Sequence, residues 1–162
     1  MTVAAAAIDS SVEHAVQAAF KRAEDIDFSP IKRKLMDERH GSGWSRQKAD
    51  DAEYLYRCFL ALQVAYDQTV NRIVPPTIVD EFWHQHILDT RKYAADCEVL
   101  FGKYLHHFPY FGMRGPEDER ALNDAAEWTL AQFSHHFGSA ASHLLEASSC
   151  SSCGRCASCR SS

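Results

Sequence analysis

The densest group of potential metal ligands in this chain begins with two histidines, His84 and His86, separated by one residue. The group continues through Cys97 to His106 and His107. These side chains fall within positions 84–107 and are interleaved with aromatic residues. Neutral imidazoles, together with a thiolate or a carboxylate, bind ions such as zinc, iron or copper. The pattern therefore predicts a metal site, whose ion the residue types do not identify further.

Helical geometry limits which of these side chains can share an ion. Each residue turns a helix by about 100°, so His84 and His86 face opposite sides of an unbroken helix. His84 shares its stripe with Asp80, whereas His86 shares its stripe with Tyr93 and Cys97. Asp80 is interpreted as a charge in the first turn that the helix dipole favours.

A break in the helix near Asp89-Thr90 would bring Cys97 back toward His86. We therefore expect His86, Cys97 and one of His106 and His107 to supply three ligands and to leave room for water. If such a site were catalytic, Asp96 or Glu81 would be the candidate base.

Four further thiols stand near the end of the chain, Cys150, Cys153, Cys156 and Cys159, in the spacing C-x₂-C-x₂-C-x₂-C. This spacing lets neighbouring thiolates chelate one ion, and it lacks the long spacer of a zinc ribbon. It also lacks the x₃ gap and proline of the bacterial iron–sulfur run. A soft ion such as copper(I) or zinc fits these thiols. Modification of the thiols by a partner enzyme, and disulfide chemistry, are the alternatives.

The segment Trp83-His84-Gln85-His86, followed by Tyr93, Asp96-Cys97, Gly102 and a histidine, resembles the core motif of the glycine-rich domain-containing protein-like family. The likeness covers Val74 to Gly115, about a quarter of the chain. The chain departs from the plant members because it has no glycine-rich region and ends in clustered cysteines. The resemblance implies a shared site without naming a reaction. The residues that the resemblance assigns to this site are Trp83, His84, His86, Tyr93, Asp96, Cys97 and His106 or His107.

The elements that must position these residues are all expected to be helices. Ser45 is a possible N-cap, Pro76 stops one helix before the next begins, and Gly102 fits a C-terminal cap. The hydrophobic periodicity predicts helices near residues 10–20, 31–38, 46–69, 78–101 with the break at 89–90, 116–137 and 140–147. Residues 105–115 are expected to form a packed loop. We see no strand with convincing alternation.

The amino-acid composition and the net charge limit the classes of protein to which this chain can belong. The 162 residues carry 46% hydrophobic and 24% charged residues with a net charge of −5, which indicates a globular domain and argues against a nucleic-acid binder. No apolar run is long enough for a membrane span, and no secretory signal is visible, so we expect a cytoplasmic protein that does not bind membranes. We predict one compact all-α domain of five or six helices over residues 1–147. A disordered cysteine-rich tail is expected over residues 148–162.

Three functions follow from these residues. The first is metal binding, with the domain holding one ion and the tail receiving or delivering a soft metal, alone or with a metal-transfer protein. The second is a metal-dependent enzyme that uses the same site. The third is a precursor or interaction protein whose tail is modified by a maturation partner.

Overall fold

The computed structural model describes residues 2–67 and 72–152, with side chains over 10–67 and 72–149. The described residues form helices and connecting loops, and none of them lies in a strand. The helices are α1 (Thr2–Glu24), α2 (Ser29–Met36), α3 (Arg46–Tyr66), α4 (Thr77–Leu88), α5 (Thr90–Phe101) and α6 (Pro116–Ser152). The expected all-α class is therefore confirmed, and none of the described helices is long and apolar enough to cross a membrane.

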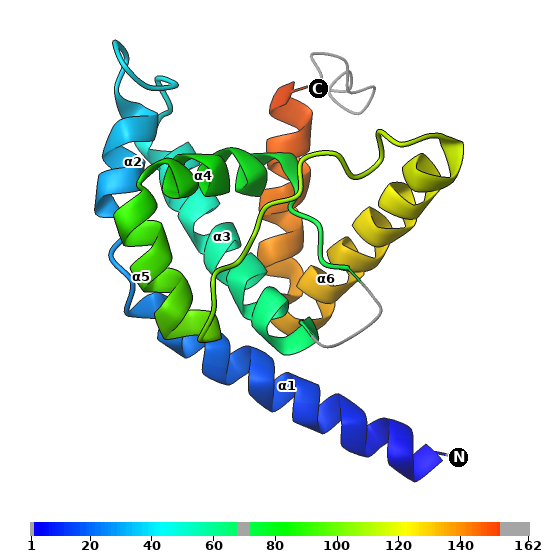
Figure 1. The fold of residues 1–162 in the computed structure, drawn as a ribbon. Helices are drawn as coiled ribbons and strands as arrows, with labels where there is room; N and C mark the ends of the chain where they lie inside the picture. Colours follow the sequence, from blue (N-terminus) through cyan, green and yellow to red (C-terminus); the bar gives the residue numbers. More distant parts are fainter. Residues whose placement is uncertain (1, 68–71, 153–162) are drawn as a thin grey trace, which may run out of the picture.

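Helix α3 is the central element, with the other helices packed around it (Figure 1). Its side chains Leu55, Tyr56, Phe59 and Leu62 are completely buried. Ser45 caps its first turn because the side-chain oxygen accepts a hydrogen bond from the backbone N–H of Lys48 at 3.1 Å. The expected cap is thus present at the start of the helix around which the core is built.

The break expected near Asp89-Thr90 separates α4 from α5. Asp89 ends α4, and its carboxylate then accepts a hydrogen bond from the backbone N–H of Lys92 in the first turn of α5. Gly102 ends α5 in the left-handed conformation, with φ of 63°, which favours glycine. The chain then runs as a loop over residues 102–115, the segment that carries His106 and His107.

Helix α6 contains two helical stretches separated by a kink at Gly138. The kink turns the second stretch back beside α3, and Ala141 and Leu145 from this stretch are buried in the core (Figure 1). The two predicted helices over 116–137 and 140–147 correspond to these stretches. The second stretch continues to Ser152, so the predicted boundary after Ala147 falls inside a helix.

Candidate metal centre

The two faces of α4 separate its two histidines. Val79, Phe82, Trp83 and His86 point into the core, where each is at least 96% buried. Asp80 and His84 lie one turn apart on another face, where the His84 side chain is 53% exposed. The geometric expectation that His84 and His86 point in different directions is therefore met.

Asp80, His84 and His107 bring three potential ligand atoms together at the surface of α4. The Nε2 atom of His107 lies 3.0 Å from Oδ1 of Asp80 and 3.1 Å from Nε2 of His84. Nε2 of His84 lies 3.5 Å from Oδ2 of Asp80. We call these three side chains the Asp80 cluster. It joins an i, i+4 pair on α4 to a residue of the loop that follows α5.

Hydrogen bonding alone does not satisfy this arrangement. An imidazole nitrogen offers one in-plane position, which holds either a hydrogen or a lone pair. Nε2 of His107 therefore cannot form good hydrogen bonds with Asp80 and His84 at the same time. A tetrahedral ion with bonds of 2.0–2.1 Å holds its ligand atoms about 3.3 Å apart. The observed separations of 3.0, 3.1 and 3.5 Å bracket that value.

His107 is held in place by helix α5 and by residues of the core. Trp83 donates a hydrogen bond from Nε1 to the hydroxyl of Tyr93, and that hydroxyl donates to the backbone carbonyl of Leu105 at 2.6 Å. The ring of Trp83 also contacts the ring of His107, with centroids 4.6 Å apart. These contacts hold the loop at Leu105, two residues before His107, and at the ring of His107 itself. Burial raises the pKa of Tyr93, so its hydroxyl stays protonated and remains a donor.

His86 is engaged in a different network, inside the core. Its Nδ1 lies 2.9 Å from the hydroxyl of Tyr56, and its Nε2 lies 2.9 Å from Oδ2 of Asp96. Burial lowers the pKa of His86 to about 4, and the nearby carboxylate of Asp96 opposes this shift only in part. Both ring nitrogens of His86 therefore have hydrogen-bonding partners, and the ring is neutral at pH 7.

The structure does not bring His86 and Cys97 together with His106 or His107 in a described ligand group. Cys97 is buried beside Tyr93, and burial raises the pKa of its thiol. The ring of His106 contacts the ring of Tyr104, with centroids 4.9 Å apart. Of the five ligands expected in the domain, His84 and His107 are the pair whose nitrogens meet.

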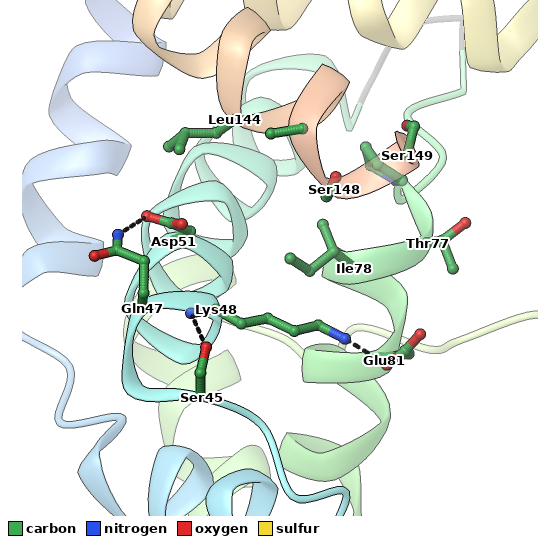
Figure 2. A pocket seen from close by; sticks show the side chains of 12 residues that line it. Ser45, Gln47, Lys48, Asp51, Thr77, Ile78, Glu81, Leu144, Ser148 and Ser149 are labelled. Atoms are coloured by element: carbon green, nitrogen blue, oxygen red, sulfur yellow. Dashed lines mark hydrogen bonds and ion pairs between the residues drawn. The ribbon is translucent and has the colours of Figure 1, made fainter. Parts of the chain in front are cut away.

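The two candidate bases also have other partners. Asp96 accepts a hydrogen bond from Nε2 of His86 and forms an ion pair with Lys92 at 3.0 Å. The carboxylate of Glu81 lies 3.9 Å from Nζ of Lys48, on a side of α4 that faces α3 (Figure 2). Neither carboxylate belongs to the Asp80 cluster.

The sequence pattern indicates Asp80 only as a charge that the helix dipole favours, and not as a ligand. The i, i+4 spacing of Asp80 and His84 was the signal that could have identified it. A second ligand group, Glu13 with His135 and His136, was not anticipated either. There, Nδ1 of His136 lies 2.6 Å from Oε2 of Glu13, and Nε2 lies 2.9 Å from the hydroxyl of Tyr66. This second group links α1 and α3 to α6.

The predicted thiol site lies largely beyond the part of the chain that the structure describes. Cys153, Cys156 and Cys159 fall outside the described residues, and Cys150 is described as part of α6 without its side chain. The helix that leads to these cysteines ends beside a pocket of about 590 Å³. Figure 2 shows Ser148 and Ser149 of α6 on one side of this pocket and Thr77 and Ile78 of α4 on the other.

Fold and site together define an all-α protein that presents a carboxylate and two imidazoles at one surface point. The chain belongs to the UCP032817-like family, whose family model matches residues 18–141. This range contains the whole Asp80 cluster. Comparison with curated proteins and with solved structures found no match.

The expected membership of the glycine-rich domain-containing protein-like family is wrong, because the family model that matches most of the chain is a different one. The resemblance depended on a few residues spread over about a quarter of the chain. Several of them, including Trp83, Tyr93 and Gly102, have structural roles here. Residues of these types are required by helix packing and capping, so they are a weak indication of family.

Proposed function

We propose that this protein binds a divalent transition-metal ion through Asp80, His84 and His107. The observation that carries the proposal is the convergence of three ligand atoms at 3.0, 3.1 and 3.5 Å. One carboxylate oxygen and two imidazole nitrogens suit zinc, and also iron or copper. This ligand set retains His84 and His107 from the residues predicted by sequence and replaces His86 and Cys97 with Asp80.

The exposure of the cluster supports an ion with an open coordination position. The side chain of His107 is 17% exposed, that of Asp80 33% and that of His84 53%. Three protein ligands at a surface leave a fourth position for water or for another ligand. The inner side of the cluster is fixed by Trp83 and by the loop that Tyr93 holds, so the ligands are placed before the ion arrives.

The proposal is tested by titrating metal-free protein, produced without a histidine tag, with Zn²⁺ in a calorimeter. We expect one ion to bind at the domain, and we expect His84→Asn and His107→Asn each to weaken that binding by at least roughly tenfold. His106→Asn is the matched control, because it changes the neighbouring histidine on the same loop.

Zn²⁺ binding at the domain must be measured without any contribution from the four terminal thiols. The titration is therefore repeated in a variant with Cys150, Cys153, Cys156 and Cys159 all changed to Ser. Binding that survives in this variant and disappears with His84→Asn supports the domain site. Equal affinity in His84→Asn, His107→Asn and His106→Asn would refute the proposed ligands.

A further inference from the structure

A pocket of about 320 Å³ shares His107 with the Asp80 cluster. Its walls come from the end of α3, the connection at residues 72–75, α4 and the loop after α5. The lining includes four aromatic residues and one arginine, Tyr66, Trp83, Phe108, Phe111 and Arg72. We call this space the aromatic pocket. Its volume lies near the lower end of the range of roughly 300–1,000 Å³ that is typical of small-molecule sites.

Hydrogen bonds to the helices fix the walls of the aromatic pocket. Gln63 of α3 donates from Nε2 to the backbone carbonyl of Ile73 at 3.0 Å. The hydroxyl of Thr129 on α6 accepts from the backbone N–H of Val74 at 3.1 Å. The opposite wall is the loop that α5 ties down just before His107. The pocket is therefore shaped before a ligand arrives, which lowers the entropy cost of binding.

The charges that line the aromatic pocket favour an anion. Within the described part of the chain, no carboxylate pairs with Arg72, whose guanidinium carbon lies 5.0 Å from the ring centroid of Phe111. Asp67 also lines the pocket, and its carboxylate forms an ion pair with Nζ of Lys103 at 2.6 Å. The guanidinium of Arg72 is thus available to a ligand. Its planar set of N–H donors matches the two oxygens of a carboxylate.

We propose that the aromatic pocket binds a small aromatic carboxylate, with the carboxylate on Arg72 and the ring against Phe108 and Phe111. Phe108 is 49% exposed, so a ligand ring that covers it removes apolar surface from water. Because Arg72 lies over Phe111, a charge and a ring surface stand side by side, as they do in an aromatic acid. This inference goes beyond the proposed function, since an organic acid can bind here without an ion at the Asp80 cluster.

Two-dimensional ¹H–¹⁵N NMR on the metal-free full-length chain tests the inference with 2-naphthoate as the probe. The indole N–H of Trp83 reports on the aromatic pocket, whereas that of Trp44 lies outside its lining. We expect 2-naphthoate to shift the Trp83 signal until the site is saturated and to leave the Trp44 signal in place. The uncharged analogue 2-naphthalenemethanol should bind at least roughly tenfold more weakly, because it cannot form the charge-assisted bonds to Arg72.

Two substitutions separate the charge from the ring contact. Arg72→Gln should weaken 2-naphthoate binding at least roughly tenfold, because the guanidinium is lost. Phe108→Ala should weaken it by roughly three- to tenfold, through loss of the ring contact. Arg91→Gln is the matched control, because it removes the same charge at an exposed position of α5 that does not line the pocket. This control should bind 2-naphthoate as the wild type does.

The inference is overturned if the Trp83 signal does not respond to 2-naphthoate. Equal affinity in Arg72→Gln and Arg91→Gln, or equal affinity for 2-naphthoate and 2-naphthalenemethanol, overturns it as well. None of these results bears on Zn²⁺ binding, because the titration is done without metal and Arg72 is not among the proposed metal ligands. Conversely, Zn²⁺ affinity that does not depend on His84 would refute the metal site and leave an Arg72-dependent response to 2-naphthoate as support for this inference.

Discussion

At the residue scale, two histidines two positions apart have opposite chemical environments. His84 is half exposed and shares a surface cluster with a carboxylate and a second imidazole. His86 is 1% exposed and is held by Tyr56 and Asp96. The first arrangement suits an ion that arrives from solvent. The second is a buried hydrogen-bond network, in which a neutral histidine connects α4 to α3 and α5.

The burial of His86 predicts that the protein loses stability in mild acid. Its pKa is about 4 in the folded chain and 6.5 when exposed, so the unfolded chain binds the extra proton between these values. The stabilisation is present above pH 6.5 and is lost as the pH falls toward 4. From pH 7 to pH 5 we expect the free energy of unfolding contributed by this residue to fall by about 2 kcal/mol.

Denaturant unfolding of the wild type and of His86→Gln at pH 7 and pH 5 measures this contribution. The difference in unfolding free energy between the two proteins should shrink by about 2 kcal/mol at the lower pH, because glutamine does not titrate. Ser11→Ala, at an exposed position of α1 that carries no titratable side chain, is the control and should show the same pH dependence as the wild type. A constant difference between wild type and His86→Gln would contradict the buried neutral state of His86.

At the element scale, α5 fixes the loop that carries His107. The hydroxyl of Tyr93 accepts from Trp83 on α4 and donates to Leu105 on the loop. Tyr93→Phe removes both bonds and leaves the indole N–H of Trp83 buried without this partner. We expect a loss of about 1–3 kcal/mol in the free energy of unfolding.

Tyr93→Phe should also weaken Zn²⁺ binding roughly tenfold, because the loop that positions His107 is no longer tied to α5. Calorimetry and thermal unfolding on the same samples measure the two effects. Tyr110→Phe, on the same loop at a 60% exposed position, is the control for both. Unchanged affinity in a folded Tyr93→Phe variant would show that the loop holds His107 without this bridge.

The kink in α6 depends on a backbone conformation that favours glycine. Gly138 has φ of 70° and ψ of −163°, a region that other residues rarely adopt. A Cβ at this position would meet no atom within 4 Å, so Gly138→Ala tests backbone strain without a steric clash. We expect it to destabilise the fold by about 1–3 kcal/mol in denaturant unfolding. Ser139→Ala, at the exposed next residue, should be close to neutral.

At the scale of the whole molecule, the proposed ion would join α4 to the loop that follows α5. Such a ligand stabilises the folded chain because the unfolded chain does not bring the three side chains together. With free Zn²⁺ at 100 times its Kd, the stabilisation is about 2.7 kcal/mol, which raises the Tm by roughly 5–10 °C. Differential scanning calorimetry with and without a chelator measures this shift.

The double variant His84→Asn/His107→Asn should show no increase in Tm from the domain site. Both proteins should carry the Cys-to-Ser changes in the tail, so that thiol binding does not contribute. An equal Tm increase in the double variant would place the stabilising ion elsewhere, for example at Glu13 and His136, whose side chains meet between α1 and α6.

Local sequence signals predicted most of the fold. Ser45, Pro76, Asp89 and Gly102 mark helix ends through backbone hydrogen bonding and dihedral preference, which depend on near neighbours alone. The separation of His84 from His86 followed in the same way from the 100° turn per residue. These features are set by positions a few residues apart, so the sequence by itself determined them.

The partner of each histidine was decided only by the tertiary structure. The choice depends on which face of α4 packs against α3, and on the path of the loop after Gly102, which brings His107 across 23 positions of sequence to His84. Helical periodicity gives the two faces of α4, but it does not say which one the core covers. Burial of Phe82, Trp83 and His86 against α3 turned Asp80 and His84 outward. For this reason a carboxylate that looked like a helix-dipole charge became a candidate ligand, and the histidine expected to bind the ion became part of the core.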